Sequence, residues 1–300
     1  METFVKDTKE IKEAKKETGL LDEILCDRRL MNDLHALDID DSEISNYLPL
    51  LATYLDQRAA EEDPRHKLEA PYPGMTMKLC IDDSGKLSYV LGPNEETKRK
   101  EALEKNYIYK DFPEEWADLN GKSVKGERYK KLKTALAKTF MKDCVKPWVY
   151  VKGEANSGKS YYLAAVLNGL AADGETVCFI NCAKRFDELR SLANTNRKEF
   201  DKIMAKLQKC GTMVIDDFGS EFKNEYIRDM ILLPILSERS RAGLRTYFTS
   251  QYSLEEIKQL YSLFKGYIQG GRVSSLIEKN IEKVVTLEVG IETVSQKRAK

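Results

Sequence analysis

The sequence predicts an α/β protein: a parallel β-sheet covered by helices on both faces, preceded by a smaller, mostly helical N-terminal domain. An apolar run, a glycine-rich loop and a helical pattern follow one another between residues 148 and 167. Three further apolar runs, at 176–180, 212–215 and 245–249, alternate with amphipathic segments. Strands at this spacing, with helices between them, form parallel sheets that are buried on both faces. At 300 residues the chain exceeds a typical single domain, so a second domain is expected.

The N-terminal part of the chain has a different pattern from the rest. Up to about residue 54 its apolar residues recur at helical spacing. Short alternating runs at 75–81 and 86–91 flank a turn signal and predict a β-hairpin. The charge-dense segment 93–102 indicates a linker or an exposed helix. We therefore place a domain boundary near residue 105, which predicts domains at 1–105 and 106–300.

The glycine-rich loop has the spacing of a phosphate-binding motif, Gly153-Glu-Ala-Asn-Ser-Gly158-Lys159-Ser160. The two glycines let the backbone turn tightly and point successive N–H groups inward. Lys159 supplies a cation for the terminal phosphates, and Ser160 offers a hydroxyl to Mg²⁺. This pattern predicts that the chain binds a nucleoside triphosphate. The candidate contacts are Gly153, Glu154, Ala155, Asn156, Ser157, Gly158, Lys159, Ser160 and Tyr161.

Polar residues follow two later strands of the predicted sheet. Asp216 and Asp217 come directly after the run at 212–215, and Ser250 and Gln251 follow the run at 245–249. Because ligands of such sheets bind beyond the carboxyl ends of the strands, these residues are expected near the phosphate loop. We predict Asp216 as the Mg²⁺ partner and Asp217 as the residue that orients or deprotonates the attacking water. Ser250 and Gln251 are candidates for sensing the γ-phosphate.

The composition of the chain limits its possible partners and location. The formal net charge is +0, so contact with nucleic acid needs a local basic patch rather than a global field. The six cysteines show no zinc-ligand spacing. No apolar stretch approaches the roughly 20 residues that a membrane span requires, and a secretory leader is not evident. We expect a cytoplasmic protein without a membrane partner.

The chain from about residue 107 to 290 resembles the bacterial replicative helicase loaders of the DnaI and DnaC type and the related transposition ATPase IstB. The matching segments are 153–160, 162–165, 214–219, 227–229, 234–236, 246–253 and 272–277, together with Arg239. This resemblance implies an AAA+ P-loop ATPase domain that uses ATP and Mg²⁺. It also implies two partners, the replicative ring helicase and single-stranded DNA, and self-association through the AAA+ domain.

Departures from the family pattern bear on catalysis. Gln251 stands where the family has asparagine, and Leu276 stands where it has an arginine four residues after Arg272. One of those family arginines normally reaches the γ-phosphate held by a neighbouring subunit. We therefore expect hydrolysis to be weak or stimulated by a partner, with Arg239, Arg272 and Lys279 as candidate substitutes. Leu276 either replaces the arginine that would reach the neighbouring γ-phosphate, or it packs in the core beside Val273.

A locally basic region lies between the second and third predicted strands, in a long charged helical segment at 184–208. In the loaders that this chain resembles, the region lines the path of single-stranded DNA, and lysine or arginine contacts to phosphate are independent of sequence. A solvated helix face is the alternative interpretation. The candidate DNA contacts are Lys184, Arg185, Arg190, Arg197 and Lys198.

These observations predict an ATP-dependent loader that binds the replicative ring helicase through residues 1–105 and helps to deliver it onto single-stranded DNA during replication initiation. Two alternatives stay open. One is an IstB-like transposition helper, and the other is a nucleotide-dependent adaptor with little hydrolysis.

Overall fold

The computed structural model describes residues 19–63, 70–121, 124–221, 224–262 and 267–288. The chain divides into two compact units, residues 1–100 and 101–300. The division falls inside helix α4 (Glu95–Asn106), five residues before the position predicted from the sequence. The charge-dense segment before that position is therefore mostly helical.

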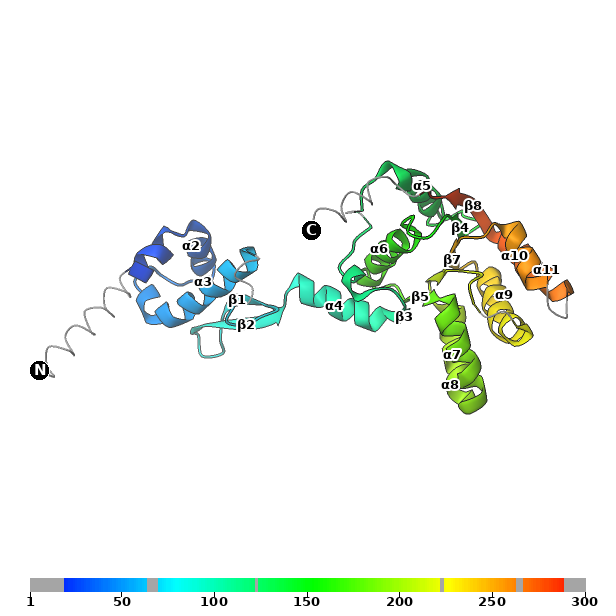
Figure 1. Ribbon diagram of the computed structural model, residues 1–300. Coiled ribbons are helices and arrows are strands. Elements are labelled where there is room, and N and C mark those ends of the chain that lie inside the picture. The colour runs from blue at the N-terminus through cyan, green and yellow to red at the C-terminus, as the bar shows by residue number, and fades with distance from the viewer. Residues whose placement is uncertain (1–18, 64–69, 122–123, 222–223, 263–266, 289–300) are drawn as a thin grey trace, which may run out of the picture. The chain divides into compact units, whose positions relative to one another are not determined.

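The N-terminal unit packs helices against a two-stranded hairpin (Figure 1). Its regular elements are α2 (Arg28–His35), a short 3₁₀ helix (Ile44–Tyr47), α3 (Leu48–Glu62), β1 (Met75–Ile81) and β2 (Leu87–Pro93). The strands pair antiparallel from Met75 opposite Pro93 to Ile81 opposite Leu87, which confirms the predicted hairpin. Leu30 and Leu34 of α2, Leu51 of α3 and Leu87 of β2 form its core.

One buried side chain joins α3 of this unit to the hairpin. Gln57 is 1% exposed, and its amide nitrogen donates to the carbonyl of Met75 at 2.7 Å. Its amide oxygen accepts from the backbone N–H of Tyr72 at 2.9 Å. A buried amide is tolerated here because both of its ends have partners.

The second unit contains a six-stranded sheet in the order β3-β5-β6-β7-β4-β8, with every neighbouring pair parallel. Its strands are β3 (Tyr107–Lys110), β4 (Trp148–Lys152), β5 (Val177–Asn181), β6 (Thr212–Asp216), β7 (Arg245–Ser250) and β8 (Ile281–Thr286). The sequence predicted β4 to β7 and missed β3 and β8. Both missed strands lie at sheet edges, where strands need not form continuous apolar runs.

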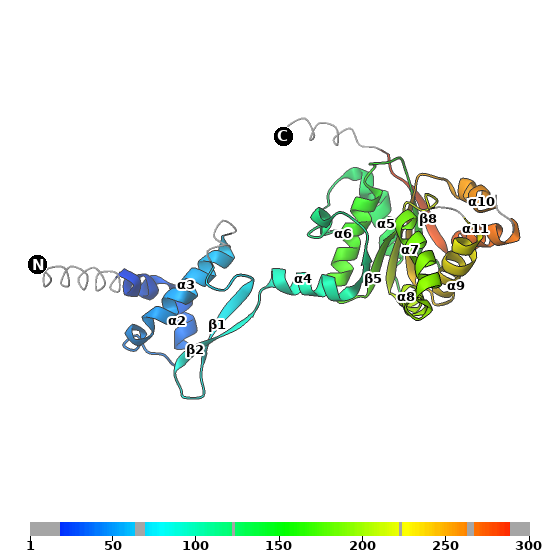
Figure 2. The ribbon, with the colours of Figure 1, turned by 60° about the horizontal axis from the view of Figure 1, so that its bottom comes forward.

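Helices cover both faces of this sheet, as predicted. Side chains alternate along a strand, so Trp148 and Tyr150 of β4 face one core, while Val149 and Val151 face the other. Figure 2 shows α6 on one side of the sheet, with α9 and α11 on the other. The helices are α5 (Lys130–Lys138), α6 (Lys159–Ala172), α7 (Cys182–Thr195), α8 (Arg197–Lys209), α9 (Leu233–Arg241), α10 (Leu254–Ser262) and α11 (Tyr267–Asn280).

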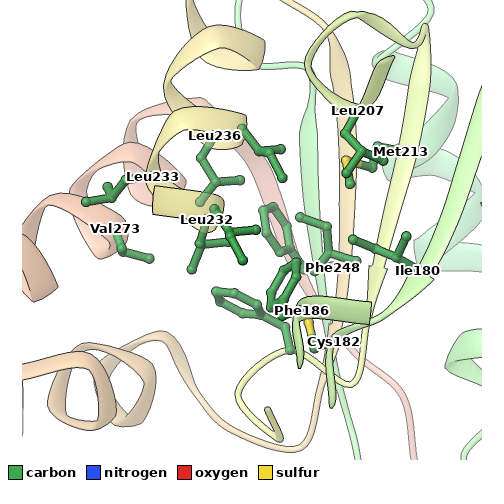
Figure 3. Packing of buried hydrophobic residues seen from close by; sticks show 14 of the residues in the cluster. Ile180, Cys182, Phe186, Leu207, Met213, Leu232, Leu233, Leu236, Phe248 and Val273 are labelled. Atoms are coloured by element: carbon green, nitrogen blue, oxygen red, sulfur yellow. The ribbon is translucent and has the colours of Figure 1, made fainter. Parts of the chain in front are cut away.

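The larger core lies between the sheet and α7 to α11. In Figure 3, Leu232 and Leu236 lie toward Phe248 of β7 and Phe186 of α7, while Leu233 lies toward α11. Val273 of α11 joins the same cluster and is fully buried. This apolar layer fixes α11 on the outer side of α9.

The charged segment at 184–208 is two helices rather than one. Asn196 ends α7 and caps α8, because its side-chain oxygen accepts a hydrogen bond from the backbone N–H of Glu199 at 3.1 Å. Asparagine is among the strongest N-cap residues, so the break is encoded locally. Over the described ranges, no helix is long and apolar enough to cross a membrane.

Candidate nucleotide-binding site

The glycine-rich loop joins the end of β4 to the start of α6 and is anchored to the neighbouring strand. The backbone N–H of Gly153 donates to the carbonyl of Ser250, the last residue of β7, at 3.0 Å. A Cβ at Gly153 would collide with the carbonyl of Leu287. Gly158 caps α6 with φ of 87°, a backbone conformation that favours glycine. Both glycines are therefore required by the geometry of the loop.

Lys159 is folded back into the loop. Its ammonium group donates to the carbonyls of Gly153 at 2.9 Å and Glu154 at 2.7 Å, and to the hydroxyl of Ser157 at 3.3 Å. Burial lowers the pKa of Lys159, and the nearby carboxylates of Asp216 and Asp217 oppose that shift. A phosphate that entered the loop would offer this desolvated cation a charged partner in place of neutral carbonyls.

Three side chains meet at the first turn of α6. The hydroxyls of Ser160 and Thr249 both donate to Oδ1 of Asp216, each at 2.6 Å. Burial raises the pKa of Asp216 to about 6, although these two hydrogen bonds favour the ionised form. Ser160 and Asp216 present two adjacent hard oxygen ligands at a helix N-terminus, and this donor set fits Mg²⁺. Sequence reasoning missed Thr249, although it precedes the named Ser250.

Asp217 projects differently from Asp216, as expected from its neighbouring position. Its backbone adopts φ of 51°, and its N–H donates to the hydroxyl of Thr249 at 2.9 Å. Oδ2 of Asp217 accepts a hydrogen bond from the side-chain amide of Asn181 at 3.2 Å. A non-glycine residue held at positive φ is strained, and such strain persists where the surrounding structure imposes it. Asn181, the last residue of β5, was not among the predicted site residues.

The remaining loop residues differ in exposure. Glu154, Ala155 and Asn156 are exposed at the loop tip, where Asn156 has φ of 61°, whereas Ser157 is buried. Tyr161 lies just inside α6, and its ring contacts the ring of Trp116 edge-on at a centroid distance of 5.5 Å. The tip is therefore open to a ligand, while the base of the loop is packed.

Ser250 does not face the phosphate loop as expected, whereas Gln251 stays a candidate. The hydroxyl of Ser250 is fully buried, donates to the carbonyl of Phe218 at 2.6 Å and accepts from the N–H of Tyr252 at 3.0 Å. Its hydrogen bonds therefore close the turn after Asp217 rather than face a phosphate. Gln251 is exposed, one residue beyond the strand. Thr249, not Ser250, is the β7 hydroxyl that contacts Asp216.

Arg239 was predicted as a substitute arginine finger, and its position does not permit that role. Its side chain is fully buried. The guanidinium donates to the carbonyls of Leu207 at 3.0 Å, Cys210 at 2.8 Å and Arg245 at 2.6 Å, and to the hydroxyl of Thr246 at 2.9 Å. The planar guanidinium group of Arg239 thus connects the end of α8 to the start of β7. A group buried in this way cannot reach a neighbouring subunit.

Arg272 and Leu276 lie on α11 with different surroundings. Arg272 is exposed, whereas Leu276 is half-buried and packs against the larger core. Val273 and Ile277, beside Leu276 on the helix, are fully buried. Leu276 therefore occupies the packing position that the sequence analysis left as one of two alternatives.

The basic region on α7 and α8 carries its own counter-charges. Arg185 pairs with Asp111 and with Glu188, and its guanidinium stacks on the ring of Tyr109 at 3.9 Å from the centroid. Only 14% of the Arg185 side chain is exposed, so it is poorly placed for DNA.

The other candidate DNA contacts are more accessible, but three of them also have acidic neighbours. Lys184 lies 3.7 Å from Asp111, Arg190 lies 2.5 Å from Asp187, and Arg197 lies 3.0 Å from Asp201. Lys198 is exposed.

A strand, a glycine-rich loop and a helix, with a hydroxyl and a carboxylate joined at the helix start, define the geometry of a P-loop phosphate site on a parallel α/β fold. Comparisons with solved structures show a similar fold. Over 63% of this chain and 96% of the other, the fold is similar to that of a putative primosome component from Streptococcus pyogenes, with 20% identity and a TM-score of 0.50. A crystal structure of DnaI covers the same shares, with 21% identity and a TM-score of 0.49.

The sequence resembles the replicative helicase loader DnaI of Bacillus subtilis, with 26% identity over 114 residues. This match spans 38% of the chain and only 36% of the length of that relative. No protein-family model matches the chain. The resemblance to the helicase loader DnaI, predicted from the motifs, is confirmed.

Proposed function

We propose that this protein is an ATP-dependent helicase loader, which binds the replicative ring helicase and helps to place it on single-stranded DNA during replication initiation. One observation carries the nucleotide part of the proposal: the Ser160–Asp216–Thr249 cluster beside the desolvated ammonium of Lys159. The resemblance to a replicative helicase loader supports the choice of partner.

Each residue of the site has a stated task in this proposal. Lys159 exchanges the carbonyls of Gly153 and Glu154 for phosphate oxygens, and the N–H groups at the start of α6 hold the same phosphates. Ser160 and Asp216 would hold Mg²⁺, which supplies charge neutralisation at the phosphates. Binding then favours the ionised form of Asp216, whose charge burial otherwise opposes.

In this proposal hydrolysis depends on Asp217 and on an arginine that reaches the γ-phosphate from a neighbouring subunit. Asp217, held by Asn181 and Thr249, is positioned to orient or deprotonate water. A guanidinium that stabilises the transferring phosphoryl group contributes orders of magnitude in rate. Because Arg239 is buried and Leu276 is apolar, Arg272 is the remaining candidate among the named arginines. We therefore propose a slow ATPase that a partner stimulates.

We assign contact with the helicase to residues 1–105. The unit within this range has its own apolar core, and several large apolar side chains stay outside that core. Val90 and Leu91 of β2 and Ile81 of β1 are 54%, 40% and 39% exposed. Exposed apolar side chains on a small, independently packed unit favour protein contact.

The test is size-exclusion chromatography with light scattering on the full chain mixed with its cognate ring helicase, with and without ATP and Mg²⁺. We expect the wild-type protein to form a complex with the helicase, and ATP should change the amount or size of this complex. The Lys159→Ala variant should still form the complex, but ATP should no longer change it. Lys152→Ala is a matched control, because Lys152 precedes the loop and lies near Glu256 at 3.9 Å. Absence of any complex with the helicase would refute the loader assignment while leaving the nucleotide site untouched.

The buried Arg239 and the packed Leu276 favour one second candidate, a nucleotide-dependent adaptor with little hydrolysis. Such an adaptor would bind ATP tightly and bind the helicase, but single-stranded DNA would not stimulate turnover. An ATPase assay with helicase and DNA separates the two candidates.

A further inference from the structure

One buried hydroxyl group beside the phosphate loop has no role in the site as described. Tyr129 is 1% exposed, and the proton of its hydroxyl group has no acceptor among the residues that the structure describes. Leaving a buried polar group unpaired costs about 1–3 kcal/mol, so such groups require an explanation. Phenylalanine would fill the same space without this cost.

The position of Tyr129 directs that hydroxyl at the loop. Tyr129 ends a short 3₁₀ helix (Glu127–Tyr129) ahead of α5, and its ring stacks on the ring of Tyr162 in α6 at 4.7 Å, with an interplanar angle of 19°. The hydroxyl approaches Gly158 so closely that a Cβ there would collide with it. Gly158 is the residue that caps α6, where the N–H groups of the helix converge. The stack therefore holds an unpaired donor at the anion-binding end of the helix.

A cation lies at the same corner. The guanidinium of Arg128 sits over the Tyr129 ring at 4.8 Å from the centroid. One of its terminal nitrogens would be 3.6 Å from a Cβ built on Gly158. Burial raises the pKa of Tyr129 and outweighs the opposing effect of the neighbouring Arg128, so the hydroxyl keeps its proton at neutral pH and remains a donor. A protonated donor, a guanidinium and a helix N-terminus together favour an anionic ligand.

We propose that the Tyr129 hydroxyl donates a hydrogen bond to an α-phosphate oxygen of the nucleotide, with Arg128 beside it. This inference rests on the proposed nucleotide site and adds a contact from outside the glycine-rich loop. The α-phosphate is common to ATP and ADP, so the contact serves binding in both states rather than the chemical step. Tyr129 is in these terms a binding residue and not a catalytic one.

A purely structural role for Tyr129 makes a different prediction. If the residue only packs its ring on Tyr162, loss of the hydroxyl leaves nucleotide affinity unchanged. If the hydroxyl instead had a hidden structural partner, its loss would lower the stability of the nucleotide-free protein.

The experiment is Tyr129→Phe in the full chain, with ATP and ADP affinities measured by isothermal titration calorimetry in Mg²⁺. Melting temperature is measured on the same nucleotide-free samples. We expect both affinities to weaken by about tenfold, since hydrogen bonds to charged groups are among the stronger ones. The melting temperature of the nucleotide-free variant should equal or exceed that of the wild type, because an unpaired buried hydroxyl is removed.

Tyr247→Phe is the matched control. Tyr247 is a fully buried tyrosine whose hydroxyl contacts that of Thr139 at 2.7 Å. This control should lose stability and keep both nucleotide affinities. Unchanged affinities in Tyr129→Phe, or a loss confined to ATP, would overturn the proposed contact, as would a lowered melting temperature of the nucleotide-free variant. A wild-type protein that binds neither nucleotide would instead overturn the proposed function.

Discussion

The hydroxyl group of Ser160 donates a 2.6 Å hydrogen bond to the carboxylate of Asp216 and so joins the first turn of α6 to the end of β6. The two residues are 56 positions apart in the chain. Their contact places the two oxygen atoms that would hold Mg²⁺ next to each other before any ligand enters. The same carboxylate also accepts from Thr249 of β7, so three elements converge on one group.

Asp216→Asn should stabilise the nucleotide-free protein at pH 7.5. Burial raises the pKa of Asp216 from 3.8 to about 6, so the folded state binds more protons than the unfolded state between these values. Stability therefore falls as pH rises from about 4 to 6 and stays lower above that range. Asparagine keeps an acceptor for Ser160 and carries no charge, so the gain should be about 1–3 kcal/mol. Chemical denaturation between pH 4 and 8 measures it.

The same substitution should abolish the effect of Mg²⁺ on nucleotide binding, because the amide is a poor ligand for the ion. Fluorescent-nucleotide titration with and without Mg²⁺ provides this check. A variant that loses stability at neutral pH would contradict a destabilising buried charge at Asp216.

Asp217→Asn should affect turnover more than binding. An amide cannot take a proton or orient water as a carboxylate does, whereas the contact with Asn181 needs only an oxygen acceptor. We expect a fall in ATP turnover of about 100-fold or more, with nucleotide affinity within about threefold of wild type. Steady-state hydrolysis and equilibrium titration on one preparation measure the two quantities. Equal losses in both would show that Asp217 acts through the turn it occupies.

Arg239→Ala should destabilise the fold strongly. The substitution leaves the carbonyls of Leu207, Cys210 and Arg245 without their donor inside the protein and opens a cavity. The expected loss is about 3–5 kcal/mol of unfolding free energy. Arg241→Ala is the control, because Arg241 is exposed, pairs only with Glu238 among its described contacts, and should cost less than about 1 kcal/mol. A soluble Arg239→Ala variant with wild-type stability would reopen its role at a subunit contact.

Leu276→Arg should lower the melting temperature without accelerating ATP turnover. Leu276 packs against the core beside the buried Val273 and Ile277, so a guanidinium there loses apolar contact and part of its hydration. We expect a loss of about 1–3 kcal/mol. Differential scanning fluorimetry together with an ATPase assay across protein concentrations decides the matter. Faster turnover at high concentration, with unchanged melting, would instead identify Leu276 as the site of a lost finger.

Arg272→Ala should remove whatever ATPase activity the helicase or DNA stimulates, while basal nucleotide binding persists. The side chain is exposed on α11, and a trans-acting guanidinium acts only in the assembled state. Lys283→Ala, which removes an exposed positive charge from the neighbouring strand β8, is the control. Stimulation that survives in Arg272→Ala would leave the trans mechanism without a candidate among the named arginines.

Local patterns in the sequence determined the parts of this protein that depend on near neighbours. The phosphate loop, the strands β4 to β7 and the hairpin of the first unit follow from glycine spacing and from apolar runs or alternation over a few residues. The nomination of Asp216 follows from the rule that ligands bind beyond the carboxyl ends of parallel strands. These features are encoded within short windows, so they can be recognised without any knowledge of the fold.

Only the tertiary structure decided which residues meet across the sheet. Thr249 reaches Asp216 because β7 lies beside β6 in the sheet. The residues of the two strands do not reveal this strand order. Arg239 looks like a surface charge in sequence, but it is buried because its fork satisfies carbonyls some 30 residues away. The hydroxyl of Tyr129 meets Gly158 only when the residues before α5 pack on α6. Burial and pairing are properties of the packed chain, so residue type alone does not determine them.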